Sequence, residues 1–216
     1  MKKLRGLLKA AHFGPTLIVT SISFGIATYY WWEGPAYVIA FGVFTGQLVV
    51  GWSNDLYDFD DDLKHQRTDK PLVSGLITKQ YLQKWLRFML PFSFVANLFG
   101  PLGIKGGSVY MLGIACGVAY NFYFKFNRFS PLPYAIAFAA LPSSVVISKD
   151  LKPPLWMLLG GALFGMAAHF INVIKDMDQD QASGINGLPQ RLGKRNSIAA
   201  AAVLIALGIA VLVRFK

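Results

Sequence analysis

The sequence has little cysteine, little charge for its length and few acidic residues. Its single cysteine, Cys116, excludes a disulfide within the chain and a cysteine-based metal site. Charged residues make up 15% of the 216 positions, whereas soluble domains usually have about 25%. No small-residue cleavage site follows the basic N-terminal segment, so the first apolar run is interpreted as a retained span rather than a signal peptide. These absences favour a membrane protein in which few polar residues are left to carry out chemistry.

Apolar runs repeat along the whole chain, which indicates a polytopic membrane protein. Each run is close to the ~20 residues that a helix needs to cross a bilayer, and the connections are too short to hold a separate soluble domain. We therefore predict an all-α, polytopic transmembrane bundle of about seven spans, forming one domain over residues 1–216. The predicted spans are residues 16–32, 36–57, 79–99, 106–124, 132–148, 154–175 and 196–213.

Basic residues are distributed unequally between the two ends of this bundle. With a cytoplasmic N-terminus, 16 of the 21 basic residues lie on the cytoplasmic side and 5 on the other. This asymmetry predicts that orientation, and it explains the net charge of +10 without a nucleic-acid partner. Nine of the 11 acidic residues also fall on the cytoplasmic side. Short loops and the lack of a transit peptide favour a prokaryotic cytoplasmic membrane, with the polar loops facing the cytoplasm.

The densest acidic segment, "NDLYDFDDD", follows the second apolar run and has five aspartates within eight residues. Asn54, Asp58 and Asp62 are spaced four apart, so on a helix they share one face. Like charges at this spacing repel each other and destabilise a helix, so a compensating cation is expected. A solvated acidic helix end is the alternative interpretation.

A second acidic segment, "NVIKDMDQD", closes the sixth apolar run on the same side of the membrane. Asn172, Asp176 and Asp180 repeat the four-residue spacing. Two such ladders that face each other would form an all-oxygen site for a hard divalent cation. Mg²⁺ prefers such ligands together with substrate phosphates, and no His/Cys set with zinc spacing competes.

Basic and aromatic residues accompany both acidic segments. Arg67 and Lys70 follow the first, Lys175 lies within the second, and "YNFYFK" brings Tyr120, Tyr123 and Lys125 to the same end. Metal ligands, phosphate-binding cations and an apolar cavity together predict a substrate with a diphosphate head and an apolar tail, such as a prenyl diphosphate. Ring faces would stabilise the allylic cation that it forms, and a dry cavity would exclude water. For each aromatic residue, packing or interface anchoring is the alternative.

These motifs resemble the UbiA superfamily of intramembrane prenyltransferases. Residues 54–62 match its N-D-x-x-D-x-x-x-D motif, and residues 172–180 resemble D-x-x-x-D-x-x-x-D with Asn172 in the first position. "RTDKPLVSG", "YNFYFK" and "SGINGLPQRLG" resemble three further family segments, so the resemblance covers roughly residues 10–195. It implies a helical bundle around a central cavity. It also implies Mg²⁺-dependent transfer of a prenyl group from a prenyl diphosphate to an aromatic or other lipophilic acceptor.

The resemblance implies a role for each residue of the site. The expected catalytic residues are Asn54, Asp55, Asp58, Asp62, Asp176, Asp180, Tyr120 and Tyr123. The expected metal ligands are Asn54, Asp58, Asp62, Asn172, Asp176 and Asp180, and the expected diphosphate-binding residues are Arg67, Lys70, Lys125 and Lys175. Lys70 stands where the family usually has arginine, so a point charge replaces a bidentate fork.

Members of the family commonly have two spans more than the seven predicted here, and these spans help to enclose the cavity. We therefore expect either a cavity open to membrane lipids between the seventh span and the first, or a homodimer that covers this face. The residues expected at that edge are Val203, Leu204, Leu207 and Val211.

Two other functions are compatible with the motifs. A terpene cyclase would use the same diphosphate ionisation without an acceptor. A non-catalytic cation-binding membrane protein would place aspartates along a path at mid-bilayer, whereas here they lie at helix ends on one side. The acceptor class stays open among aromatic acids, quinone precursors, sugar phosphates and tetrapyrroles. His169 either contacts an acceptor or is a buried, hydrogen-bonded histidine.

Overall fold

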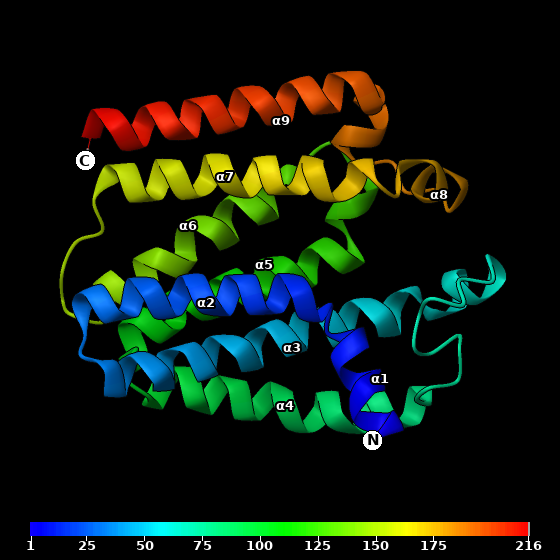
Figure 1. Cartoon of the computed structure of the whole chain (residues 1–216), viewed down its shortest axis with the longest axis horizontal. Helices are drawn as coiled ribbons and strands as arrows, with labels where there is room; N and C mark the ends of the chain where they lie inside the picture. The colour runs from blue at the N-terminus through cyan, green and yellow to red at the C-terminus, as the bar shows by residue number, and fades with distance from the viewer. Residues whose placement is uncertain (216) are drawn as a thin grey trace.

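The computed structural model describes residues 1–215, and within them every regular element is a helix, as the sequence predicts. Seven of these helices are long and run alongside one another (Figure 1), and each corresponds to one predicted span. The long helices are α2 (Phe13–Tyr30), α3 (Glu33–Lys64), α4 (Lys79–Phe99), α5 (Gly103–Phe122), α6 (Pro131–Ile147), α7 (Leu155–Ile174) and α9 (Leu188–Phe215). The short elements are α1 (Lys2–Ala10), the 3₁₀ helix η1 (Phe124–Phe126) and α8 (Met177–Ala182).

The lengths and compositions of the helices fit a membrane protein. Within residues 1–215, α3, α7 and α9 are each long and apolar enough to cross a bilayer. The pair α1 and α2, bent by 68°, counts as a fourth such unit if it forms one span, and α6 is apolar but shorter. The all-α bundle is therefore confirmed, whereas seven spans and a cytoplasmic N-terminus stay predictions.

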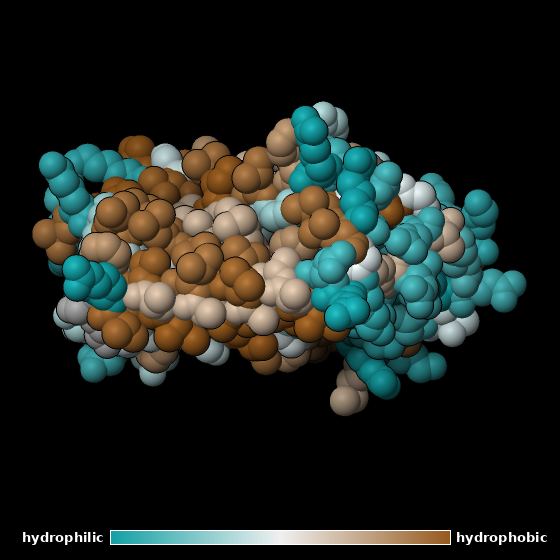
Figure 2. All heavy atoms as spheres, turned by 90° about the horizontal axis from the view of Figure 1, so that it is seen from above, coloured by the Kyte–Doolittle hydropathy of each residue, from teal (hydrophilic) through white to brown (hydrophobic). Residues whose placement is uncertain are grey.

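Helix α3 is longer than the membrane span predicted within it, because it continues seven residues beyond the end of that span at residue 57. Its 32 residues span about 48 Å at 1.5 Å per residue, which exceeds the ~30 Å of a hydrocarbon core. Its final turns, which hold the aspartates, therefore extend out of the apolar band. Figure 2 shows hydrophobic side chains along the length of the bundle and a large cluster of hydrophilic ones at one end.

The packing order of the helices determines which of them enclose the interior. Helix α3 packs against α2, α4 and α5, and α6 packs between α5 and α7. The Tyr110 hydroxyl donates to the Val43 carbonyl at 2.8 Å, and the Asn97 amide donates to the Gly42 carbonyl at 3.0 Å. These buried bonds fix α5 and α4 against α3. Gly107 allows the α4–α5 contact, because a Cβ there would lie 2.3 Å from the Asn97 carbonyl oxygen.

Helix α9 lies at the edge of the bundle. Within residues 1–215, its substantial contacts are with α7 and α8 alone. Val203 is 58% exposed and Leu207 is 49% exposed, and Leu204 and Val211 are partly exposed. The predicted edge residues therefore lie beside an uncovered apolar face. Whether lipid or a second copy of the chain covers that face stays a prediction.

Helix α1 packs against the segment that joins α3 to α4. The chain turns sharply between α1 and α2 at His12, whose φ of 50° lies in the left-handed region. The Trp52 indole donates to the Leu7 carbonyl at 2.9 Å, and the Lys9 ammonium donates to the Asp69 carbonyl at 2.9 Å. Helix α1 thereby holds residues 65–78 against the polar end of the bundle.

Candidate active site

Two aspartates of the first acidic segment form ion pairs with basic side chains of the segment that joins α3 to α4. Asp55 and Asp62 are seven residues apart, which on a helix leaves them about 20° from alignment, and both are buried. The Lys70 Nζ atom lies 2.9 Å from Asp55 Oδ1 and 3.8 Å from Asp62 Oδ2, and Arg67 Nη1 lies 3.4 Å from Asp62 Oδ1. Burial opposes a charge on Lys70, but the carboxylates of Asp55, Asp62 and Asp58 together outweigh it, so the pKa of Lys70 is raised.

Asp58 faces a different group of partners. Its Oδ1 atom binds the buried Lys125 ammonium, and its Oδ2 atom accepts a hydrogen bond of 2.9 Å from the Asn54 amide. Asn54 also donates to Asn121 Oδ1 at 3.3 Å, and Asn121 donates to Ser53 Oγ at 3.2 Å. The buried Asn121, near the end of α5, was missed by the sequence analysis because a single amide belongs to no recognised spacing.

Asn54, Asp58 and Asp62 lie on one helix, as predicted, but Asp62 has different partners from the other two. A four-residue step rotates a side chain by about 40° around the helix, so two steps accumulate about 80°. Asn54 and Asp58 consequently turn toward α5, whereas Asp62 turns with Asp55 toward Lys70.

The second acidic segment is not one continuous helix, which corrects the prediction of a ladder along one helix face. Helix α7 ends at Ile174, Lys175 and Asp176 form a turn, and α8 begins at Met177. Asn172 is exposed on α7, whereas Asp180 belongs to α8. Asp176 and Asp180 keep the helical spacing, because the Asp180 N–H donates to the Asp176 carbonyl at 2.9 Å.

Asp180 nevertheless lies within reach of the cations that bind the first segment. Burial raises the pKa of Asp180 to about 6, while a hydrogen bond from Gln190 and the charges of Lys125 and Arg67 lower it. The Gln190 amide donates to Asp180 Oδ2 at 2.9 Å. Coulomb interactions weaken with distance. The charges of Lys125 and Arg67 therefore act on both acidic segments. Gln190, like Asn121, was missed by the sequence analysis.

An aromatic cluster lies inside the bundle, between α5, α6 and α7. The Tyr120 ring is 5.1 Å from Tyr134 and 5.4 Å from His169, between ring centroids. The fully buried His169 places its Nε2 atom 3.0 Å from Ser130 Oγ. The interpretation of His169 as a buried, hydrogen-bonded histidine is confirmed.

Two predicted site residues take part neither in the ion pairs nor in the aromatic cluster described above. The Tyr123 side chain is 66% exposed and packs edge-on against the neighbouring Phe124 ring. Lys175 is exposed at the end of α7 and takes part in none of the ion pairs within residues 1–215. Their roles at the site stay predictions.

The sequence profile of the UbiA prenyltransferase family matches residues 15–215. The chain belongs to this family. No curated protein matches the UbiA-family chain in sequence.

Solved structures share the fold of this UbiA-family protein. A UbiA homologue from Archaeoglobus fulgidus bound to DMAPP and Mg²⁺ superposes with a TM-score of 0.79 at 14% identity, over 97% of this chain and 77% of that one. The Aeropyrum pernix K1 homologue gives a TM-score of 0.72 at 17% identity, over 96% and 76%. A structure of digeranylgeranylglyceryl phosphate synthase gives 0.70 at 20% identity, over 98% and 76%.

The residues of the UbiA-family site fit a divalent cation by their chemistry. Within residues 1–215, no three His, Cys, Asp or Glu side chains converge as a metal site. Lys70 binds Asp55 and Lys125 binds Asp58, so each lysine supplies positive charge where a cation would. The buried Asp55 Oδ2 atom has no hydrogen-bond partner. The donor atoms here are oxygens, such as those of the Asp55 and Asp58 carboxylates, and Mg²⁺ prefers oxygen ligands.

Proposed function

We propose that this UbiA-family protein transfers a prenyl group from a prenyl diphosphate to a lipophilic acceptor at the polar end of its bundle. The proposal rests on the position of Lys125, which binds Asp58 of the first acidic segment and whose charge also acts on Asp180 of the second. Cations and carboxylates from both segments thus meet beside an apolar interior. The A. fulgidus homologue bound to DMAPP and Mg²⁺, or to GPP and Mg²⁺, supports a prenyl diphosphate donor.

The proposed donor site assigns a role to each charged group. Asn54, Asp58, Asp176 and Asp180 would hold Mg²⁺, which when bound offsets the charge of the diphosphate and makes it a better leaving group. Arg67, Lys70 and Lys125 would donate hydrogen bonds to the diphosphate oxygens. Lys70 and Lys125 contact carboxylates in the structure. Each lysine therefore has to direct some of its N–H groups toward the oxygens of the prenyl diphosphate.

The reaction exchanges one bond at the first carbon of the prenyl chain. The bond from this carbon to the diphosphate oxygen breaks, and its electron pair leaves with the diphosphate. A nucleophilic atom of the acceptor forms the new bond and gives up a proton. Tyr120, inside the bundle, would present its ring face to the positive charge that develops on the prenyl carbon. The apolar interior would keep water from competing with the acceptor.

Product analysis tests this proposal against its alternatives. Purified protein would be incubated with Mg²⁺, a prenyl diphosphate (DMAPP, GPP or geranylgeranyl diphosphate) and an acceptor panel of aromatic acids, quinone precursors, sugar phosphates, tetrapyrroles and glyceryl phosphate lipids. Transfer predicts an acceptor heavier by one prenyl group in the mass spectrum. A terpene cyclase would instead give a cyclic hydrocarbon without any acceptor, and a non-catalytic protein would release no diphosphate.

A pair of variants links the product to the site. Asp176→Asn should abolish product formation, because it removes a carboxylate from the proposed metal site. Asp178→Asn removes the same charge two residues away, from an exposed side chain, and should leave product formation unchanged. If both variants form product at the wild-type rate, Asp176 does not hold the metal.

A further inference from the structure

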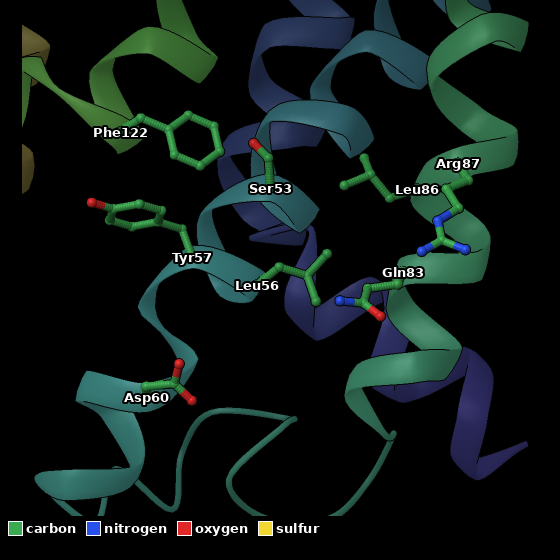
Figure 3. A pocket seen from close by; sticks show the side chains of 8 residues that line it. All are labelled: Ser53, Leu56, Tyr57, Asp60, Gln83, Leu86, Arg87 and Phe122. Carbon is green, nitrogen blue, oxygen red and sulfur yellow. The ribbon is translucent and has the colours of Figure 1, made fainter.

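A pocket lies on the side of the bundle where α3 and α4 come together, next to the end of α5. It is open to the outside and has a volume of about 550 Å³, a size that suits a small ligand or a headgroup. Figure 3 shows its walls: Leu56 and Tyr57 from α3, Leu86 from α4 and Phe122 from α5 provide apolar surface. Polar groups lie at its rim, which gives the pocket an amphipathic lining.

The unpaired charge in this pocket is positive. Arg87 lines the α4 wall, is exposed, and forms none of the ion pairs within residues 1–215. Asp60 lines the opposite wall (Figure 3), but its carboxylate lies 3.5 Å from the Lys79 ammonium, which offsets its charge. Gln83, one turn before Arg87, adds an amide donor. An anionic group with several oxygens would satisfy both donors.

An apolar surface continues from the pocket along α4. Leu90 and Phe94 lie three and seven residues after Arg87, so they share its face of the helix, and each is 49% exposed. A guanidinium that borders such a surface matches a phospholipid, whose phosphate lies at the membrane interface and whose acyl chains continue into the hydrocarbon core.

We propose that the pocket between α3, α4 and α5 binds the phosphate headgroup of a membrane lipid. Arg87 donates hydrogen bonds to the phosphate, Gln83 donates a further one, and the acyl chains run along the apolar face of α4 that Leu90 and Phe94 expose. The proposal does not depend on the proposed enzymatic activity, because it uses none of the residues assigned to catalysis.

This lipid site is separate from the proposed donor site but shares a wall with it. The Tyr57 and Phe122 rings lie edge to face with centroids 4.8 Å apart, and both line the pocket. Tyr57 also contacts the proposed donor site, because the Lys125 ammonium is 4.9 Å from its ring centroid. A headgroup in the pocket therefore packs against Tyr57 without reaching Asp58.

Native mass spectrometry of the detergent-purified protein tests this proposal with two lipids that differ only in the phosphate. Phosphatidic acid should be retained on the wild-type protein, and diacylglycerol with the same acyl chains should not. Arg87→Gln should weaken retention of phosphatidic acid by about tenfold, the effect of losing one charge-assisted hydrogen bond. Lys84→Gln, which removes an exposed cation from the same helix outside the pocket lining, should retain it. Gln83→Trp, which fills the pocket mouth and leaves Arg87 in place, should also lose it.

Three outcomes would overturn the proposal. Equal losses in Arg87→Gln and Lys84→Gln would show general attraction of an anionic lipid to a basic surface. Retention of diacylglycerol at the level of phosphatidic acid would show binding through the acyl chains alone. If inorganic phosphate raises the melting temperature of the wild-type protein but not of Arg87→Gln, and phosphatidic acid is not retained, then the pocket binds free phosphate instead of a lipid.

Discussion

Replacing Lys70 with methionine should destabilise the protein by about 3 kcal/mol, because Asp55 would keep a buried charge without its partner. The Asp55 side chain is 2% exposed and that of Lys70 is 12% exposed. Removing one partner of a buried ion pair costs about 3–5 kcal/mol. The lower end applies here because His12 Nε2 lies 3.6 Å from the same Asp55 oxygen, so a polar group stays beside it.

The assay is unfolding in a denaturing-detergent titration followed by circular dichroism. Lys79→Met is the matched control: its partner Asp60 is 84% exposed, so its loss should change stability by less than about 0.5 kcal/mol. Lys70→Arg, which keeps the charge, should stay close to the wild type. Asp55→Asn combined with Lys70→Met should be more stable than Lys70→Met alone, because a neutral amide leaves no uncompensated charge. The reasoning is refuted if Lys70→Met is no less stable than Lys79→Met.

The site and the packing of α1 give three further expectations. Asp58→Ala and Asp176→Ala should each reduce turnover by more than about tenfold, equivalent to ~1.4 kcal/mol of barrier, with an unchanged circular dichroism spectrum; a smaller loss would remove that residue from the set of metal ligands. A chelator should abolish turnover, and added Mg²⁺ should restore it, whereas turnover that survives chelation would exclude a metal-dependent step. Gly6→Val should destabilise the protein by about 1–3 kcal/mol, because a Cβ at Gly6 would lie 2.5 Å from Ile77 Cγ2. Gly14→Ala, where a Cβ meets no atom within 4 Å, is its control in the same unfolding titration, and equal stability of the two variants would contradict the packing argument.

The helices could be predicted from the apolar runs because lipid-facing segments need uninterrupted apolar length. Helix α4 coincides with the predicted residues 79–99, and α6 is displaced by one residue. The membrane span predicted within α3 ended at residue 57, although the aspartate spacing already predicted helix through Asp62. Lys70, Arg67 and Lys125, brought in by the tertiary fold, bind three of these aspartates and allow the helix to continue.

The site was predictable in its residue types but not in its pairings. Four-residue spacing identified Asn54, Asp58, Asp176 and Asp180, because carboxylates repeated at that spacing are costly without a cation. The lysine that each aspartate binds depends on how residues 65–78 and the turn after α5 fold back. The spacing of residues along the sequence does not predict this. Supporting amides such as Asn121 and Gln190 were missed because they act singly, through contacts between distant segments.

The ion pairs of Lys70 and Lys125 have a consequence for the order in which ligands bind. In the structure, Asp55 and Asp58 are already bound to the ammonium groups of Lys70 and Lys125. A metal ion alone has to displace lysines, and a diphosphate alone has to separate them from aspartates, so each ligand by itself breaks favourable contacts. Bound together, the metal takes the carboxylates and the diphosphate takes the ammonium groups. The two ligands are therefore expected to strengthen each other's binding by the same factor, as thermodynamic reciprocity requires, and the protein should distinguish a metal–diphosphate complex from the free metal ions that surround it.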